Sequence, residues 1–171
     1  ADFLAAHPVP DDSPLVTDLP DEEIFNVTSS TWELYFDGAA RTEKDLDGAP
    51  RRRAGAGVVF KGPMGETFYH SFSLLKEECS NNEAEYEALI FGLLLALSMN
   101  IQTLHVYGDS QLIVRQINGI YEVRKQELVP YCLAAQGLIK KFEFIQVDHI
   151  PRGENASAYA LAKLAAALIF P

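Results

Sequence analysis

Cysteine is scarce in this chain, and long apolar runs are missing. Cys79 and Cys132 are far apart and lack ligand-type spacing, so the sequence indicates neither a zinc site nor a disulfide framework. No uninterrupted apolar run is long enough to span a bilayer, and no basic, apolar, small-residue leader of a secretion signal is visible. We therefore expect an intracellular protein, cytoplasmic or nuclear and not secreted, with no membrane contact.

Lysine and arginine are absent from the first 30 positions. That stretch holds four prolines and seven acidic residues, so it carries −7 of the net formal charge of −10 and leaves −3 for the remainder. Such a composition is typical of extended linkers or tails. We predict an acidic, proline-rich tail or linker over 1–30 and one domain over 31–171. The small charge of that domain does not argue against a polyanionic partner.

The remaining length suits one compact domain with a sizeable core. Period-2 and helical patterns predict strands at 32–37 (ending at Asp37 or just beyond), 54–60, 67–74, 103–109 and 142–150, and helices at 83–99, 110–118, 126–141 and 155–169. A loop should join the first two strands and end with Arg51–Arg53. The order β-β-β-α-β-α-α-β-α predicts an α/β domain, in which helices pack against a mixed sheet that starts with a hairpin.

The helix predicted over 83–99 is central to this pattern. Ser80, Asn81 and Asn82 are favourable capping residues just before its start. The helix has almost no polar face, so we expect burial on most sides. Glu85 shares the buried side, and a buried carboxylate is costly unless a partner compensates it. Glu85 therefore either pairs with a basic residue at the helix edge or belongs to a polar site.

Two predicted strands end in an aspartate, at Asp37 and at Asp109. Because sites in α/β sheets collect at strand ends, Asp37, Glu85 and Asp109 could converge. Clustered carboxylates take up protons unless divalent cations hold them, and oxygen ligands of this kind suit Mg²⁺ or Mn²⁺. Two such ions can clamp the attacking water and the leaving oxygen of a phosphodiester. The structural alternative is that Asp109, which precedes Ser110, only caps the next helix.

Four segments resemble motifs of the type 1 ribonuclease H family: Tyr35–Ala39, Ser80–Tyr86, Tyr107–Gln111 and His149–Leu161. More narrowly, they resemble the ribonuclease H domain of plant Ty3/gypsy-type LTR retrotransposon polyproteins. Residues 1–8 are similar to the end of the connection that joins reverse transcriptase to that domain. The resemblance implies a ribonuclease H-like fold, a five-stranded mixed sheet with its first three strands antiparallel. It also implies an adjoining reverse-transcriptase or polyprotein domain as a partner.

The resemblance further implies a reaction and its residues. The reaction is endonucleolytic hydrolysis of the RNA strand of an RNA/DNA hybrid with two Mg²⁺ ions, for which Mn²⁺ can substitute. Asp37, Glu85 and Asp109 match three of the four carboxylates that hold the ions. His149 matches a mobile histidine that helps proton transfer or product release. The positions that match substrate contacts are Gly38, Ser80, Asn81, Asn82, Gln111 and Asn155.

The fourth carboxylate of the family is missing. An aspartate is expected four residues after Asn155, but this chain has Tyr159 there. A phenol is a poor Mg²⁺ ligand, so we expect a weakened second metal site and reduced activity. Asp148 and Glu154 are close in sequence, but nothing in the sequence shows that either compensates. Two functions stay open: a hybrid-specific endonuclease, and a catalytically degenerate domain that binds nucleic acid or serves structurally.

Overall fold

The computed structural model describes residues 30–44 and 46–168, so the predicted tail lies outside the described residues except for its last position. Five strands form the sheet: β1 (Trp32–Lys44), β2 (Pro50–Lys61), β3 (Thr67–Leu74), β4 (Thr103–Gly108) and β5 (Phe144–His149). The helical segments are α3 (Asn81–Ser98), α4 (Gln111–Ile117), η1 (Gln126–Leu128), α5 (Val129–Ile139), η2 (Arg152–Asn155) and α6 (Ala156–Ala167). None of the helices in these ranges is long and apolar enough to cross a membrane.

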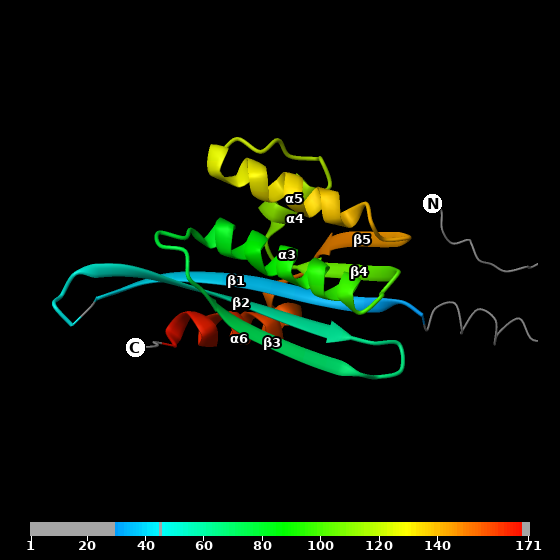
Figure 1. Cartoon of the computed structure of the whole chain (residues 1–171), viewed down its shortest axis with the longest axis horizontal. Coiled ribbons are helices and arrows are strands. Elements are labelled where there is room, and N and C mark those ends of the chain that lie inside the picture. The colour runs from blue at the N-terminus through cyan, green and yellow to red at the C-terminus, as the bar shows by residue number, and fades with distance from the viewer. Residues whose placement is uncertain (1–29, 45, 169–171) are drawn as a thin grey trace, which may run out of the picture.

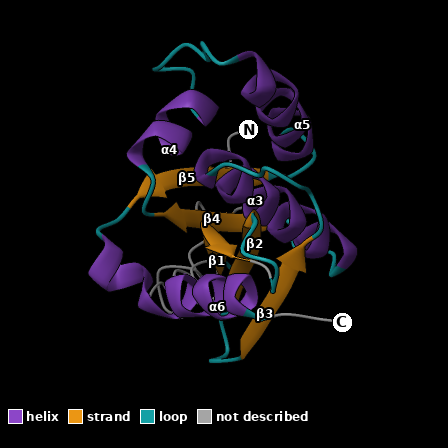
Figure 2. Cartoon of the chain, turned by 90° about the vertical axis from the view of Figure 1, so that its left-hand side faces the viewer, coloured by secondary structure: helices purple, strands orange, loops and turns teal. Residues whose placement is uncertain are grey.

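The strands lie in the order β3-β2-β1-β4-β5. The β1–β2 and β2–β3 pairs are antiparallel, whereas β1–β4 and β4–β5 are parallel. Helices α3, α4 and α5 lie on one side of this sheet and α6 lies on the other (Figure 1, Figure 2). The predicted fold class, a five-stranded mixed sheet with its first three strands antiparallel and helices around it, is confirmed.

The first hairpin corrects the prediction for β1 and the following loop. β1 does not end near Asp37 but continues to Lys44, and Arg51–Arg53 lie in β2 rather than in a loop. The far half of the hairpin is held by polar cross-strand pairs, such as Arg53 Nε to Glu43 Oε1 at 3.2 Å. A search for alternating apolar residues does not detect such strands. The hairpin therefore extends well past the helices (Figure 1).

The two longest helices on the α3 side begin as their sequences indicate. Ser80 caps α3, because its hydroxyl accepts a hydrogen bond from the Glu83 backbone N–H at 3.1 Å while the Glu83 carboxylate accepts one from Ser80 N–H at 2.9 Å. Pro130 lies in the first turn of α5, where its missing N–H is harmless. The predicted helix over 126–141 is divided, since its first turn is the 3-10 segment η1.

The main core fills the space between the sheet and α3. Leu34 and Phe36 of β1 are fully buried in the same apolar cluster as Tyr86, Leu89 and Leu93 of α3. Tyr86 satisfies its hydroxyl inside this core by donating to Gln116 Oε1 at 2.7 Å. α3 is buried on most sides, as its sequence predicts. This packing holds the first turn of α3 against β1.

The opposite face of the sheet receives α6, and two glycines of β2 make that contact close. A β-carbon at Gly55 would lie 2.4 Å from a backbone nitrogen of α6, and one at Gly57 would lie 2.3 Å from the Ala158 carbonyl oxygen. The Ser71 hydroxyl of β3 also donates to the Leu161 carbonyl oxygen at 2.7 Å. The helix therefore rests on bare strand backbone, and its position relative to β1 is well defined.

We predict that Gly57→Ala destabilises the protein. The added methyl group meets a backbone carbonyl, so α6 must move away from β2, at a cost of about 1–3 kcal/mol. Gly137→Ala is the matched control, because nothing lies within 4 Å of a β-carbon there and alanine favours the helix α5. Thermal and urea unfolding measure both changes. Equal stability of Gly57→Ala and Gly137→Ala would contradict this account of the α6 contact.

Candidate metal centre

Two aspartates meet where β1 and β4 stop pairing. The parallel register of these strands ends at Phe36 opposite Gly108. Asp37 and Asp109 are the next residues, so they lie side by side at the carboxyl ends of the paired segments. β1 itself continues beyond this point through its pairing with β2, in which Asp37 lies opposite Gly57. The expected convergence of the two aspartates is therefore a consequence of in-register parallel strands.

Glu85 reaches the same point because Gly38 has no side chain. A β-carbon at Gly38 would lie 2.2 Å from the carbonyl carbon of Ala84. The first turn of α3 consequently touches the backbone of β1, and the next residue of the helix is Glu85. Asn81, also in this turn, accepts a hydrogen bond at Oδ1 from the Ala40 backbone N–H at 2.8 Å. These contacts fix the helix start against the strand.

Asp37, Glu85 and Asp109 form a buried carboxylate triad. One oxygen from each residue lies within 4.8 Å of the other two. Asp37 is 1% exposed and Glu85 is 7% exposed. Within the described ranges, each of the three residues has one buried carboxylate oxygen without a hydrogen-bond partner. Unpaired buried carboxylate oxygens are costly, and hard oxygen ligands are what divalent cations prefer. The triad therefore fits a divalent metal ion.

The electrostatics of the triad agree with this fit. Burial, followed by repulsion from Asp109, raises the pKa of Asp37 from its ordinary 3.8 to about 7. Burial and then the two aspartates raise the pKa of Glu85 well above its usual range, while a hydrogen bond with the Gly38 backbone acts in the opposite direction. Without a cation, protons must therefore neutralise part of this cluster at neutral pH.

Asn155 connects the triad to the element that follows β5. Its side-chain amide donates to the Phe36 carbonyl oxygen at 2.9 Å and to Asp109 Oδ2 at 3.3 Å. The residue is 1% exposed, so it holds η2 against β1 and orients Asp109. This is a positioning role, which the sequence prediction of a substrate contact did not include.

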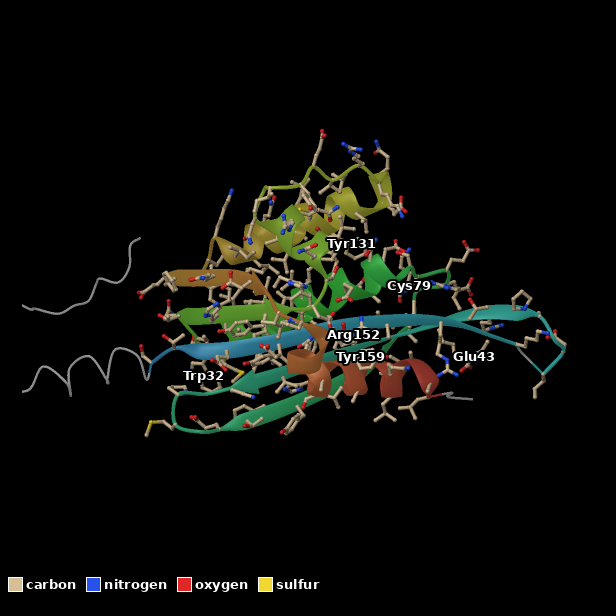
Figure 3. The ribbon with its side chains drawn as sticks, turned by 180° about the vertical axis from the view of Figure 1, so that it is seen from behind. Trp32, Glu43, Cys79, Tyr131, Arg152 and Tyr159 are labelled. Atoms are coloured by element: carbon tan, nitrogen blue, oxygen red, sulfur yellow. The ribbon has the colours of Figure 1, made fainter. Side chains whose placement is uncertain are left out.

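The triad opens into a cleft of about 520 Å³, and Tyr159 forms part of its wall. Arg152 Nε lies 3.4 Å from Asp109 Oδ2, and the guanidinium carbon lies 4.4 Å from the centre of the Tyr159 ring. Lys163 Nζ lies 5.3 Å from the same ring centre. Figure 3 shows Arg152 and Tyr159 beside one another. A phenol between two cations thus stands where the fourth carboxylate was expected.

The two acids considered as replacements do not line this cleft. Asp148 instead lies on β5, with its Oδ2 2.6 Å from His105 Nε2. Glu154 is exposed in η2. Within the described part of the chain, the triad is the only group of three or more histidine, cysteine or acidic residues arranged to hold a metal.

The other predicted site residues are divided between the cleft and its surroundings. Gly38 and Asn81 line the cleft. Ser80 serves as the cap of α3, and Asn82 follows Asn81 in the first turn. Gln111 begins α4 and is exposed, and His149 ends β5 as an exposed residue opposite Gly108. The substrate contacts and the histidine role remain predictions.

The sequence prediction missed the three basic residues of the cleft, Arg41, Arg152 and Lys163. Arg41 lies in the part of β1 beyond the predicted strand end, so no pattern indicated it. Lys163 could have been found, because it follows Tyr159 by four residues and therefore shares its face of α6.

Comparison with known proteins places this chain in a family. Residues 45–165 match the family described as reverse transcriptase-like, and the chain belongs to that family. The chain is 32% identical to ribonuclease HI of Halobacterium salinarum over 128 residues, which are 75% of this chain and 60% of that protein. The aligned part thus spans about three fifths of this relative.

Solved structures show the same architecture. The crystal structure of RNase H1 from Halobacterium salinarum superposes with a TM-score of 0.69 at 29% identity, over 79% of this chain and 96% of that chain. LC11-RNase H1, solved in complex with an RNA/DNA hybrid, gives a TM-score of 0.66 at 32% identity over the same shares, 79% and 96%. The fold is therefore ribonuclease H-like, as the sequence motifs implied.

The raised pKa of Asp37 predicts a pH dependence of stability in the metal-free protein. A carboxyl that binds its proton more tightly when folded stabilises the fold fully below the unfolded pKa of 3.8, and this contribution is lost as the pH rises through about 7. The melting temperature in EDTA should therefore fall between about pH 4 and about pH 7 and level off above that. Asp37→Asn should flatten this slope, whereas Glu122→Gln, which removes an exposed carboxylate outside the cleft, should keep it. An unchanged slope in Asp37→Asn would contradict the prediction.

Proposed function

We propose that this chain hydrolyses the RNA strand of RNA/DNA hybrids, with Mg²⁺ held by Asp37, Glu85 and Asp109. The observation that carries the proposal is the buried triad, whose unpaired carboxylate oxygens open into a cleft. The family and the fold support the same reaction, since LC11-RNase H1 was solved with an RNA/DNA hybrid bound. The first turn of α3, with Asn81 and Asn82, and Gln111 of α4 are the proposed hybrid contacts.

The chain's own residues would contribute binding, orientation and charge. Divalent ions on the triad would supply Lewis-acid stabilisation of the phosphate and activation of the attacking water. Asn155 keeps Asp109 in place through its 3.3 Å hydrogen bond, and Gly38 keeps the first turn of α3, and with it Glu85, close to β1. Arg152 adds a cation next to Asp109. Exposed His149 is placed at the end of β5, where it could exchange protons with solvent.

The setting we propose is a retrotransposon reverse transcriptase of the Ty3/gypsy kind. The motifs of the sequence support it, and the reverse transcriptase-like family is compatible with it. In this setting an adjoining polymerase domain would be a partner, residues 1–30 would act as the linker, and the protein would work in the cytoplasm or nucleus. Purification of the natural protein and its mass would test whether the domain acts inside a longer chain.

A second candidate function is hybrid binding without cleavage. The observation that favours it is Tyr159 at the position of the fourth carboxylate, in contact with Arg152 and Lys163. A site that binds only one ion well could retain the hybrid and lose most of its turnover.

Cleavage of an end-labelled RNA/DNA hybrid, first with Mg²⁺ and then with Mn²⁺, tests the proposed function. Asp109→Asn should reduce the rate by at least about 100-fold. The variant removes a proposed metal ligand itself, so its effect should exceed that of removing a residue that only supports a ligand. Tyr159→Asp should raise the Mg²⁺ rate about tenfold, roughly 1.4 kcal/mol of barrier. Glu122→Gln, outside the cleft, should match the unmodified protein.

The outcomes separate the two candidates. Cleavage that Asp109→Asn leaves intact would exclude the triad as the site. Hybrid binding without cleavage, with cleavage restored by Tyr159→Asp, would establish the binding domain instead. Equal Mg²⁺ rates for the chain and Tyr159→Asp would show that the phenol costs no activity.

A further inference from the structure

The wall of the cleft that faces the triad carries positive charge instead of a carboxylate. Tyr159 lies between the Arg152 guanidinium at 4.4 Å and the Lys163 ammonium at 5.3 Å from its ring centre. Both distances are in the range of cation–π attraction. Because α6 rests on the backbone of Gly57, the helix backbone that carries Tyr159 has a defined position relative to β2.

Of the three cations in the cleft lining, Lys163 differs in its partners. Arg41 pairs with Glu43, and Arg152 pairs with Asp109. No carboxylate of the described residues lies within ion-pair distance of Lys163, whose recorded contact is with the Tyr159 ring. Lys163 is exposed at the cleft, and its ammonium group has no anionic partner among the described residues. A bound anion such as a phosphodiester would provide the missing partner for this ammonium group, since lysine is a common phosphate ligand.

The charges of the lining also disfavour a second divalent ion. The lining includes three acidic residues, Asp37, Glu85 and Asp109, and three basic residues, Arg41, Arg152 and Lys163. The formal charges of these six side chains therefore cancel before any ion binds. One divalent cation on the triad then gives this lining a formal charge of +2, which would repel a second divalent cation.

We propose that Lys163, held against Tyr159 and assisted by Arg152, contacts the substrate phosphate in place of a second metal ion, so that the site binds one divalent ion. This inference rests on the proposed function, because the phosphate is that of the hybrid. Lys163 and Tyr159 then share one role. The Tyr159 ring positions the ammonium group, and the ammonium group supplies the positive charge that a second metal ion, bound by a fourth carboxylate, would otherwise provide.

Lys163→Met separates charge from packing. Methionine keeps an unbranched apolar stem against Tyr159, so a merely structural role of Lys163 would be preserved. Lys141→Met is the matched control, since Lys141 is an exposed lysine outside the cleft lining. Arg152 is less suitable for this test because it also contacts Asp109.

The first measurement is hybrid affinity in EDTA by fluorescence anisotropy, at several salt concentrations. Loss of one phosphate contact should lower the salt slope by about 0.9 and the affinity by about 5- to 10-fold at roughly 0.1 M salt. We expect this change for Lys163→Met and less than a twofold change for Lys141→Met. Unchanged affinity and slope in Lys163→Met, with hybrid still bound and cleaved, would overturn the inference alone.

The second measurement counts metal ions. Calorimetric titration of Mn²⁺ into the complex with a hybrid whose RNA strand carries 2′-fluoro sugars, chosen to resist hydrolysis, should show one ion per chain. Two ions of similar affinity would overturn the inference and leave the proposed function intact. Failure of the unmodified chain to bind any RNA/DNA hybrid would instead overturn the proposed function, and the phosphate assignment with it.

Discussion

Mutual repulsion among three buried carboxylates is the constraint on which the rest of this structure depends. Asp37, Glu85 and Asp109 each have an oxygen within 4.8 Å of the others, and two of them lie in nearly complete burial. Such a cluster is unfavourable by itself: burial, followed by repulsion from Asp109, raises the pKa of Asp37. The packing of α3 on β1 must provide the compensating free energy. The packing thus holds the three carboxylates together, and a cation or protons must neutralise part of their charge.

Close backbone contacts at two glycines position the side chains of the cleft. Gly38 brings the first turn of α3 onto β1, and Gly57 brings α6 onto β2 from the other side of the sheet. The first contact delivers Glu85 to the two aspartates. The second delivers Tyr159 and Lys163 to the opposite wall of the cleft. One cleft therefore combines an anionic floor suited to a divalent cation with a cationic wall suited to phosphate.

Sequence patterns predicted the fold because apolar periodicity follows burial directly. The order of all nine main elements is confirmed, and α3 is buried as its nearly apolar surface indicated. The errors lie where polar contacts build regular structure. The outer half of the β1–β2 hairpin is held by polar pairs such as Arg53 with Glu43. Such pairs produce no periodic pattern of apolar residues, so the pattern does not predict these strands. Arg41 was lost from the predicted site for the same reason.

The sequence by itself determined the element order and indicated that Asp37, Glu85 and Asp109 converge, since these depend on residue types and their spacing. Its resemblance to the ribonuclease H family implied that a fourth carboxylate is missing. Only the tertiary structure decided which side chains surround Tyr159, the residue at that position. The pairing of Tyr159 with Arg152 joins η2 to α6, and their position relative to Asp109 depends on helix packing across the sheet. The same is true of Asn155, which reaches Asp109 and the backbone of β1. Contacts between distant segments arise from packing geometry, and local sequence does not specify that geometry.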